Sequence, residues 1–166
     1  MRRVVTLATY ASIALLCVSA FQMRTALAAG AVEMQVEHMI SLSMEEYNHA
    51  MEVGDPDGWL RYFTDNVYRN GLLSAQNGKK EFSDYYQWEF KNFQAKCVVK
   101  KVLVNGRSAA VVYSWDAVHK ASGSPLQLDM VVVYEMASSG KFESASFYYD
   151  TAKAAKFFVE SSAGSK

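Results

Sequence analysis

The sequence predicts an α+β fold, with helices in the first part of the chain and an antiparallel sheet in the second. Three observations lead to this class. Apolar side chains recur every three or four residues up to about residue 93, which indicates helices. From Cys97 onward the apolar period changes to two and β-branched residues dominate, which indicates strands. The links between those strands are short and contain glycine, so consecutive strands are expected to pair antiparallel.

Residues 1–28 are predicted to be a secretory signal peptide that is cleaved after Ala28. They begin with two arginines, continue as a nearly uncharged run to Phe21, and end in a small-x-small pattern. We therefore expect export to the periplasm or the external medium, with a folded domain at 29–160 and a frayed tail at 161–166. A membrane anchor is the alternative, because the apolar run approaches the length of a span.

Three helices are expected before the sheet. Ser43 to Glu46 has the pattern of a capping box, and Gly54 ends this first helix. Asp55-Pro56 is expected to start a short second helix, followed by a short strand at Val67–Asn70. The turn at Asn77-Gly78 precedes the third helix. The expected apolar stripes are Ile40, Met44, Tyr47 and Met51, then Trp59, Leu60 and Phe63, then Phe82, Tyr86, Phe90 and Phe93, with Lys79, Lys80, Asp84, Glu89 and Lys91 mostly outside the last of these.

Four strands are expected to follow as a meander. Their predicted bounds are Cys97–Val104, Ala109–His119, Leu126–Ala137 and Phe142–Asp150. A terminal helical turn or two is expected over Thr151–Val159.

The charge balance argues against a nucleic-acid partner. The whole chain has 17 basic and 17 acidic side chains. Without Arg2, Arg3 and Arg24 of the leader, fourteen basic side chains face seventeen acidic ones, a net charge of −3. Such a domain lacks the positive field on which nucleic-acid binding depends. We also expect no stable membrane insertion once the leader is removed.

Three segments carry a resemblance to a known superfamily. Residues 47–59 resemble the "helix, small-Gly-Asp, short helix" opening of the nuclear transport factor 2-like superfamily, and residues 62–67 resemble its entry into the first strand. Residues 139–142 and 148–150 resemble the close of its SnoaL-like, polyketide cyclase-like members. The resemblance spans roughly residues 36–158. It implies a cone-shaped, curved antiparallel sheet with three N-terminal helices packed on it.

The superfamily includes ketosteroid isomerases, and the resemblance implies an isomerase set that this chain has only in part. Tyr47 stands at the position of the catalytic tyrosine. Gly71 stands where the Asp base is expected, and Val131 or Val132 where an acidic donor is expected. Isomerase chemistry of that kind is therefore not expected.

The superfamily also includes epoxide hydrolases, whose set is again incomplete. Tyr68-Arg69-Asn70 supplies the Tyr-x-Asn pattern, and Asp116 can supply one carboxylate. However, Ser114 or Tyr113 stands at the place of the arginine, and Phe147 at the place of the second Asp.

Asp116 is the candidate acid or base. If it faced the pocket, burial among apolar neighbours would raise its pKa into a useful range. Strand alternation puts Ser114, Asp116 and Val118 on one face and Tyr113 and Trp115 on the other, and leaves open which face is inside.

Aromatic residues make up 13% of the chain and are expected to line a cavity as well as the core. A tyrosine hydroxyl at the open end of a cone would orient an apolar ligand that carries one or two polar groups. The candidate ligand-binding residues are Tyr47, Tyr68, Asn70, Trp115 and Tyr134.

We expect no metal and no cofactor. His38, His49 and His119 are scattered, with no cysteine or carboxylate at ligand spacing. His49 is expected to be solvated, and His119 is considered as a base at the pocket rim. Cys97 is the one cysteine left after the leader, and it is expected to be a buried structural thiol.

These observations leave three hypotheses for function. The first is an exported, pocketed SnoaL-like domain that binds a small, largely apolar molecule and has no complete known catalytic set. The second is an enzyme, a cyclase, isomerase or hydratase/epoxide hydrolase-like protein, in which Asp116 is the acid or base, Tyr68 and Asn70 hold a water or carbonyl, and Tyr47 donates to an oxyanion. The third is a structural homodimer that pairs through the outer face of its sheet.

Overall fold

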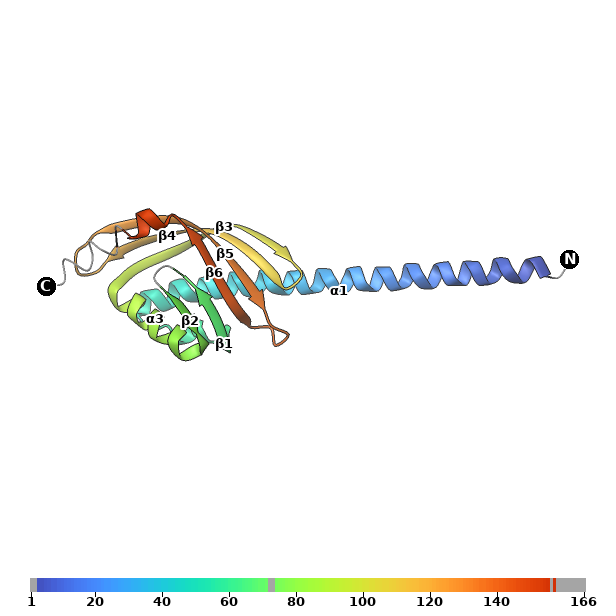
Figure 1. Ribbon diagram of the computed structural model, residues 1–166, viewed down its shortest axis with the longest axis horizontal. Coiled ribbons are helices and arrows are strands. Elements are labelled where there is room, and N and C mark those ends of the chain that lie inside the picture. Colours follow the sequence, from blue (N-terminus) through green and yellow to red (C-terminus); the bar gives the residue numbers. More distant parts are fainter. Residues whose placement is uncertain (1–2, 72–73, 156, 158–166) are drawn as a thin grey trace.

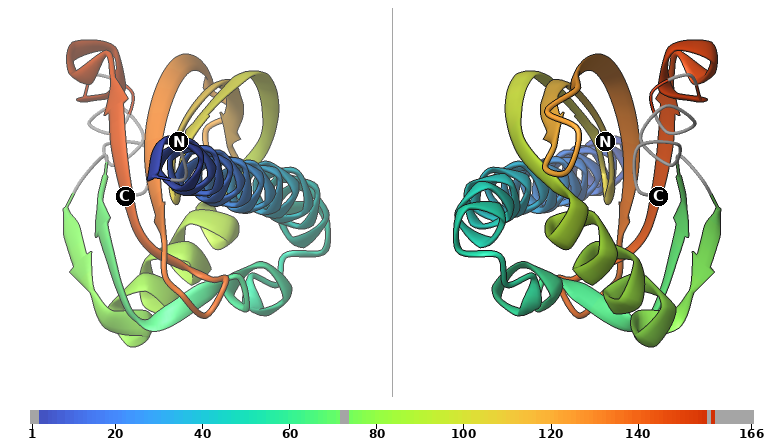
Figure 2. Two further views of the ribbon diagram at one scale, coloured as in Figure 1. Left: turned by 90° about the vertical axis from the view of Figure 1, so that its right-hand side faces the viewer. Right: turned by 90° about the vertical axis from the view of Figure 1, so that its left-hand side faces the viewer.

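The chain folds into one curved sheet whose concave side faces two helices (Figures 1 and 2). The computed structural model describes residues 3–71, 74–155 and 157, with side chains from Ala28 onward. Six strands lie in the order β2-β1-β6-β5-β4-β3. The α+β class with helices ahead of a meander is therefore confirmed.

The first helix, α1 (Arg3–Val53), is much longer than the sequence pattern suggested. It ends at Gly54, as predicted, because this residue has a φ of 77°, which a glycine adopts without strain. The predicted apolar stripe is also confirmed. The side chains of α1 that are buried against the sheet are Val36, Ile40, Ser43, Met44, Tyr47, Ala50 and Met51.

The expected capping box at Ser43 is wrong. Ser43 lies inside α1, ten residues before its end at Val53, and its hydroxyl donates to the carbonyl of Ile40 at 3.0 Å. The helix continues upstream because residues 31–42 contain neither proline nor glycine. A Ser-x-x-Glu pattern therefore marks a helix start only where the preceding residues stop being helical.

The predicted leader coincides with the part of α1 whose side chains lie outside the described residues. The backbone of residues 3–28 continues the helix, and this part of α1 extends beyond the sheet (Figure 1). Within the described part of the chain, none of the helices combines the length and apolar character needed to cross a membrane. Cleavage after Ala28 and export remain predictions.

A short helix and two strands follow α1. The helix α2 (Asp57–Leu60) begins one residue later than expected, and Asp55 Oδ1 accepts a hydrogen bond from the backbone of Asp57 at 3.0 Å. Phe63, expected on this helix, instead starts β1 (Phe63–Asn70) and is buried. The strand β2 (Ala75–Asn77) was not expected, and it pairs antiparallel with β1.

The third helix, α3 (Gly78–Asn92), begins at the predicted turn and ends one residue before Phe93, which starts β3. Three members of its predicted stripe are buried, as is Phe93. Glu89, expected mostly outside, is buried as well. This prediction was wrong, because Glu89 lies on the helix face that contacts the aromatic interior.

The predicted meander is confirmed. It consists of β3 (Phe93–Asn105), β4 (Ser108–His119), β5 (Pro125–Met136) and β6 (Phe142–Tyr149), each antiparallel to the next. β6 also pairs in parallel with β1, which carries the sheet back to the helices. β3 contains an irregularity between Val99 and Lys101 and lies at the edge of the sheet.

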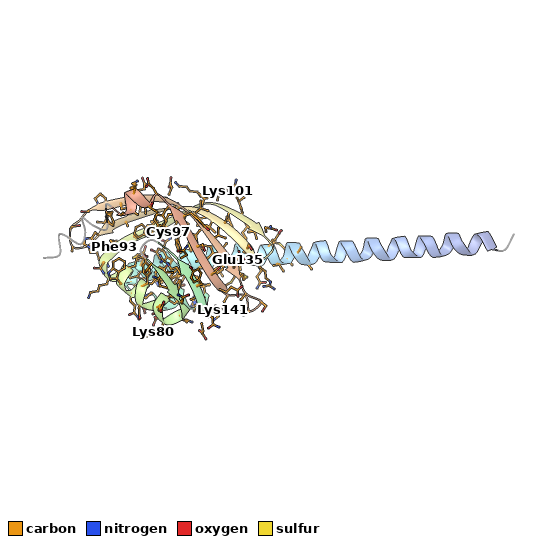
Figure 3. All side chains as sticks on the ribbon, in the orientation of Figure 1. Lys80, Phe93, Cys97, Lys101, Glu135 and Lys141 are labelled. Carbon is orange, nitrogen blue, oxygen red and sulfur yellow. The ribbon has the colours of Figure 1, made fainter. Side chains whose placement is uncertain are left out.

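The concave face of the sheet and the helices enclose a core rich in aromatic rings. Figure 3 shows side chains filling the space between α3 and the sheet, with Lys80 at the outer side of α3. On β4 the side chains of Tyr113, Trp115, Ala117 and His119 are buried, whereas Asp116 is exposed. The predicted alternation is confirmed, and the aromatic side is the inner one. Beyond β6 the backbone is helical at 151–155, and the expected tail at 161–166 lies outside the described residues.

Candidate functional site

A small cavity lies between the concave face of the sheet and the helices. Its volume is about 20 Å³, which is enough for one water molecule. Most of the cone is therefore filled by its own side chains. The polar residues that line this inner cavity are Tyr47, Arg69, Tyr86, Glu89, Tyr113 and Tyr134.

Arg69 reaches the inner cavity from β1 because strand alternation places it on the same face as the buried Val67. Its side chain is 1% exposed. Nε donates to the Tyr86 hydroxyl at 3.1 Å, and Nη1 donates to Gln76 Oε1 at 2.8 Å. The guanidinium also lies over the ring of Tyr85, with Cζ 3.9 Å from the ring centre.

The Arg69 side chain lies next to both positions at which the resemblance implied a carboxylate that this chain lacks. A Cβ added at Gly71 would meet the Arg69 guanidinium, so a side chain at the position of the Asp base would have to displace it. Phe147, at the position of the second Asp, has its ring 4.6 Å from Arg69 Cζ. In this chain Gly71 and Phe147 therefore both lie beside the buried guanidinium of Arg69.

Glu89 supplies the opposite charge from α3. Its carboxylate is buried, and Oε1 accepts a hydrogen bond from the Tyr47 hydroxyl at 2.7 Å. Burial raises the pKa of Glu89 above its ordinary value, although the positive charge of Arg69 and the Tyr47 hydrogen bond oppose this rise. Among the described residues, no carboxylate lies within ion-pair distance of Arg69.

Tyr47 connects Glu89 to the sheet. Its hydroxyl accepts a hydrogen bond from Trp115 Nε1 at 3.0 Å while it donates to Glu89. Burial and the negative charge of Glu89 raise the pKa of Tyr47 well above its ordinary value, so the phenol stays protonated. Burial likewise raises the pKa of Tyr113 and of Tyr134. Every tyrosine hydroxyl named here therefore remains able to donate a hydrogen bond at neutral pH.

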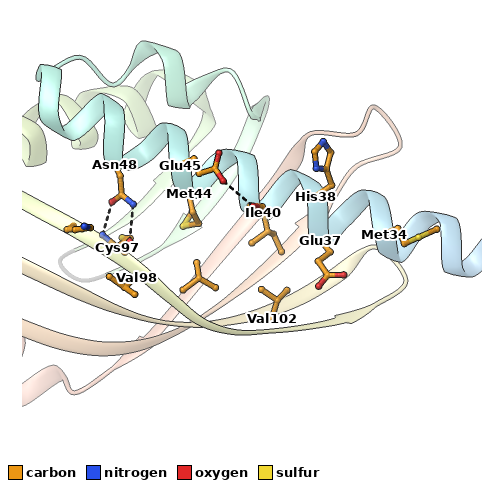
Figure 4. Close-up of a pocket in the computed structure, with 13 residues that line it drawn as sticks. Met34, Glu37, His38, Ile40, Met44, Glu45, Asn48, Cys97, Val98 and Val102 are labelled. Carbon is orange, nitrogen blue, oxygen red and sulfur yellow. Dashed lines mark hydrogen bonds between the residues drawn. The ribbon is translucent and has the colours of Figure 1, made fainter.

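A second, much larger cavity is an open groove between α1 and β3 (Figure 4). Its volume is about 780 Å³. Ile40, Met44 and Glu37 project from α1 toward β3, which contributes Val102 and the neighbouring valines (Figure 4). Several of these side chains are partly exposed, including Val99 and Val98.

The base of the groove is fixed by a pair of hydrogen bonds across it. The side-chain amide of Asn48 donates from Nδ2 to the carbonyl of Cys97 at 2.9 Å, and its Oδ1 accepts from the Cys97 backbone N–H at 2.8 Å (Figure 4). The Cys97 thiol is buried, as predicted, and burial raises its pKa well above the ordinary value. It therefore stays a neutral thiol.

Of the five predicted ligand-binding residues, the structure brings three together. Tyr47, Trp115 and Tyr134 all line the inner cavity. Tyr68 and Asn70 are exposed on the opposite face of β1 and do not reach it.

The candidate acid or base Asp116 also lies away from the inner cavity. Its side chain is exposed on the outer face of β4, opposite Lys96 in the sheet register. Its side chain thus does not converge with Tyr47. His119 is buried near the turn after β4, with Nδ1 2.9 Å from the Ser122 hydroxyl, and it does not line either cavity. In the described residues, no three His, Cys, Asp or Glu side chains gather closely enough to hold a metal ion.

Sequence reasoning missed the two charged residues of the inner cavity. The spacing of Arg69 from Val67 was the available signal, because two residues along a strand return to the same face. For Glu89 the signal was its distance of three residues from Tyr86, which places both on neighbouring parts of one helix face.

Comparisons with solved structures give folds that match along most of the chain. The epoxide hydrolase/cyclase-like enzyme SalBIII, with a role in pyran ring formation in the polyether salinomycin, is 16% identical, and the match has a TM-score of 0.62 over 73% of this chain and 95% of that one. A candidate SnoaL-like polyketide cyclase from Jannaschia sp. CCS1 is 16% identical, with a TM-score of 0.62 over 81% and 95%. An NTF2-like protein from Anabaena variabilis ATCC 29413 is 12% identical, with a TM-score of 0.62 over 69% and 89%.

At these identities the structural matches establish the fold alone. No curated protein matches the chain in sequence. A family model for the SnoaL-like domain matches residues 44–144, from the middle of α1 to β6. The match includes every lining residue of the inner cavity except Phe147, and most of those of the groove. The chain therefore belongs to the SnoaL-like domain family, within the NTF2-like fold.

Proposed function

We propose that this protein binds a small, largely apolar molecule in the groove between α1 and β3. The observation that carries the proposal is the groove itself, whose volume of about 780 Å³ falls in the range of small-molecule sites. Its walls are mainly aliphatic, from Ile40 and Met44 on one side and the valines of β3 on the other. Six polar or charged residues complete the lining and would orient the ligand: Glu37, His38, Ser41, Glu45, Asn48 and Lys96.

The test uses one pair of matched variants. Val99 lines the groove and is 37% exposed, whereas Val118 is 41% exposed on β4 outside it. Val99→Asp places a charge in the groove and is expected to abolish ligand binding, because the apolar ligand would have to desolvate the carboxylate. Val118→Asp makes the same change in a strand and is expected to leave binding intact.

Two measurements read out this comparison. The first is mass spectrometry of molecules extracted from the protein purified from the cells that produce it, and the second is thermal stabilisation by apolar probes. Loss of the ligand in Val99→Asp alone supports the groove. Equal binding by both variants, or no bound molecule and no stabilisation in the wild type, would remove the proposal.

A second candidate function, acid–base catalysis, is favoured by the surroundings of Glu89. A buried carboxylate with a raised pKa, hydrogen-bonded to a phenol and bordering a water-sized cavity, has the properties of a general acid or base. In this reading Glu89 takes the role that the sequence suggested for Asp116, and Tyr47 positions it. The relation to polyketide cyclases and epoxide hydrolase-like enzymes supports a reaction of this class.

Exchange of the α-protons of 2-decanone in D2O, followed by NMR, tests the catalytic candidate. We expect the protein to accelerate the exchange and Glu89→Gln to lower the rate about 100-fold or more, the usual contribution of a positioned acid or base. An exchange rate that Glu89→Gln leaves unchanged would exclude this role.

Export is proposed on the basis of the leader. Among the residues of α1 whose side chains are described, Val36 is the first that is buried, eight residues after the expected cleavage point. Intact mass spectrometry of the protein from producing cells is expected to give a chain that begins at Ala29. A chain that still contains the leader would contradict the proposal.

Homodimerisation is also kept as a prediction. The outer face of the sheet exposes Val118 and Tyr148. Native mass spectrometry is expected to give a dimer, and a strictly monomeric species would exclude it.

A further inference from the structure

The groove and the inner cavity are separated by a single layer of side chains. Met44 and Cys97 line both spaces, and no other described residue does. Met44 is unbranched and has three rotatable side-chain bonds, so it changes conformation at little cost compared with a branched or aromatic residue. A rotation of the Met44 side chain would join the groove, of about 780 Å³, to the inner cavity, of about 20 Å³.

The inner cavity is built around two buried charges that cancel. Arg69 and Glu89 both line it, yet they form no ion pair with each other. Each has hydrogen bonds to neutral partners instead: Arg69 to Tyr86 and Gln76, and Glu89 to Tyr47. No direct ion pair offsets the desolvation of the two charges, so a group that hydrogen-bonds to either of them inside the cavity would be stabilised there.

We propose that the groove and the inner cavity form one ligand site, and that the ligand is a neutral apolar alcohol. The apolar body lies in the groove, and a single hydroxyl passes Met44 and enters the water-sized inner cavity. This inference rests on the proposed binding function and specifies the chemistry of the ligand's polar end.

The charges of the cavity select a neutral group. A carboxylate would be attracted by Arg69 but repelled by Glu89, and an ammonium the reverse, so neither ion gains a net charge interaction that offsets the cost of removing it from water. A neutral group leaves the pair balanced.

The hydrogen-bonding capacity of the cavity then selects a hydroxyl. A hydroxyl has the size of the available space and both donates and accepts, so it can donate to the Glu89 carboxylate and accept from a tyrosine hydroxyl or from Arg69. A ketone oxygen accepts only, and it would leave the Glu89 carboxylate without a donor from the ligand.

Three ligands with the same ten-carbon chain test the head group. 1-Decanol, decanoate and decylammonium are titrated into the full-length protein at neutral pH, below the concentrations at which they aggregate, and their affinities are measured by calorimetry. We expect decanol to bind at least 10-fold more tightly than either ion. This comparison needs only the wild-type protein, so it does not depend on whether a variant folds.

A charge variant then locates the head group. Glu89→Gln removes the negative charge next to Arg69, and it is expected to raise the affinity for decanoate relative to decanol by at least 10-fold. Glu143→Gln is the matched control, because Glu143 is exposed on β6 and lines neither cavity. It is expected to leave the ratio of the two affinities unchanged.

The outcomes separate the two proposals. Equal affinities for the three probes, together with no change in Glu89→Gln, would show that the head group stays outside the inner cavity; the inference would then fail while binding in the groove stands. Tight binding of decanoate by the wild type would also overturn it. Failure of all three probes to bind would remove both the groove proposal and this inference.

Discussion

The groove and the inner cavity share the Met44 and Cys97 side chains but differ in almost every other property. The groove is open and aliphatic, and several of its residues are partly exposed. The inner cavity is about 20 Å³, and its charged and phenolic groups are buried and joined by hydrogen bonds. The same kind of substitution should therefore be tolerated on the groove side and costly on the cavity side.

The largest expected effect is at Arg69. Arg69→Met leaves the Tyr86 hydroxyl and Gln76 Oε1 without their charged donor, which is expected to lower the free energy of unfolding by about 3–5 kcal/mol. Urea unfolding followed by tryptophan fluorescence measures it. Arg61→Met is the control, because the Arg61 side chain is 62% exposed in its ion pair with Glu46 and is expected to change stability little. Similar losses in both variants would contradict the contrast between buried and exposed charge.

The second largest effect is expected at Met44, which lies between the groove and the inner cavity. Met44→Ala is expected to lower the free energy of unfolding by about 3 kcal/mol, because it deletes a buried side chain and joins the two spaces. Met34 also lines the groove but is 66% exposed, so Met34→Ala is expected to have little effect on the same unfolding curve. If the two methionine variants proved equally stable, Met44 would not be the packed wall described above.

A smaller effect is expected from the loss of one hydroxyl. Tyr47→Phe leaves the Glu89 carboxylate and the Trp115 N–H without their shared partner, at a cost of about 1–3 kcal/mol. Tyr148→Phe makes the same change at an exposed position on β6 and is expected to be neutral. Thermal unfolding compares the two variants, and a neutral Tyr47→Phe would argue against a hydrogen-bonded cluster in the cavity.

The smallest effect concerns pH. Because burial raises the pKa of Glu89, its neutral form favours the folded state, and this contribution is complete below the unfolded value of 4.5. It is lost as the pH rises from there through the folded pKa. The stability of the wild type relative to Glu89→Gln is therefore expected to fall as the pH rises above about 4.5. A difference that stays constant from pH 4 to 8 would show that Glu89 ionises as it does in the unfolded chain.

The fold was predictable because residues close together in the sequence determine how the strands of its sheet pair. The alternation along β4 and the short glycine-containing links specify an antiparallel meander, and the apolar stripe from Ile40 to Met51 specifies the packed part of α1. The length of α1 was not predictable from the capping pattern at Ser43, because a local motif does not report that the residues before it are already helical.

The candidate site was predicted only where it is aromatic. Tyr47, Trp115 and Tyr134 were found because aromatic side chains on a core face are expected to be inside. Arg69 and Glu89 were missed because charged residues are normally outside, and only a ligand site or a mutual balance of charge justifies their burial. Asp116 was considered because it is acidic, but its exposure depends on which face of β4 the helices cover.

The amide of Asn48 has a consequence for how the protein behaves at high concentration. β3 is the last strand of the sheet, and such strands offer free backbone groups to which another chain can add. At Cys97 the Asn48 side chain occupies both of these groups as a neighbouring peptide would. Asn48 thus keeps the backbone of Cys97 from pairing with the strand of another chain. Asn48→Leu would free both groups, and it is the variant in which to look for fibril growth.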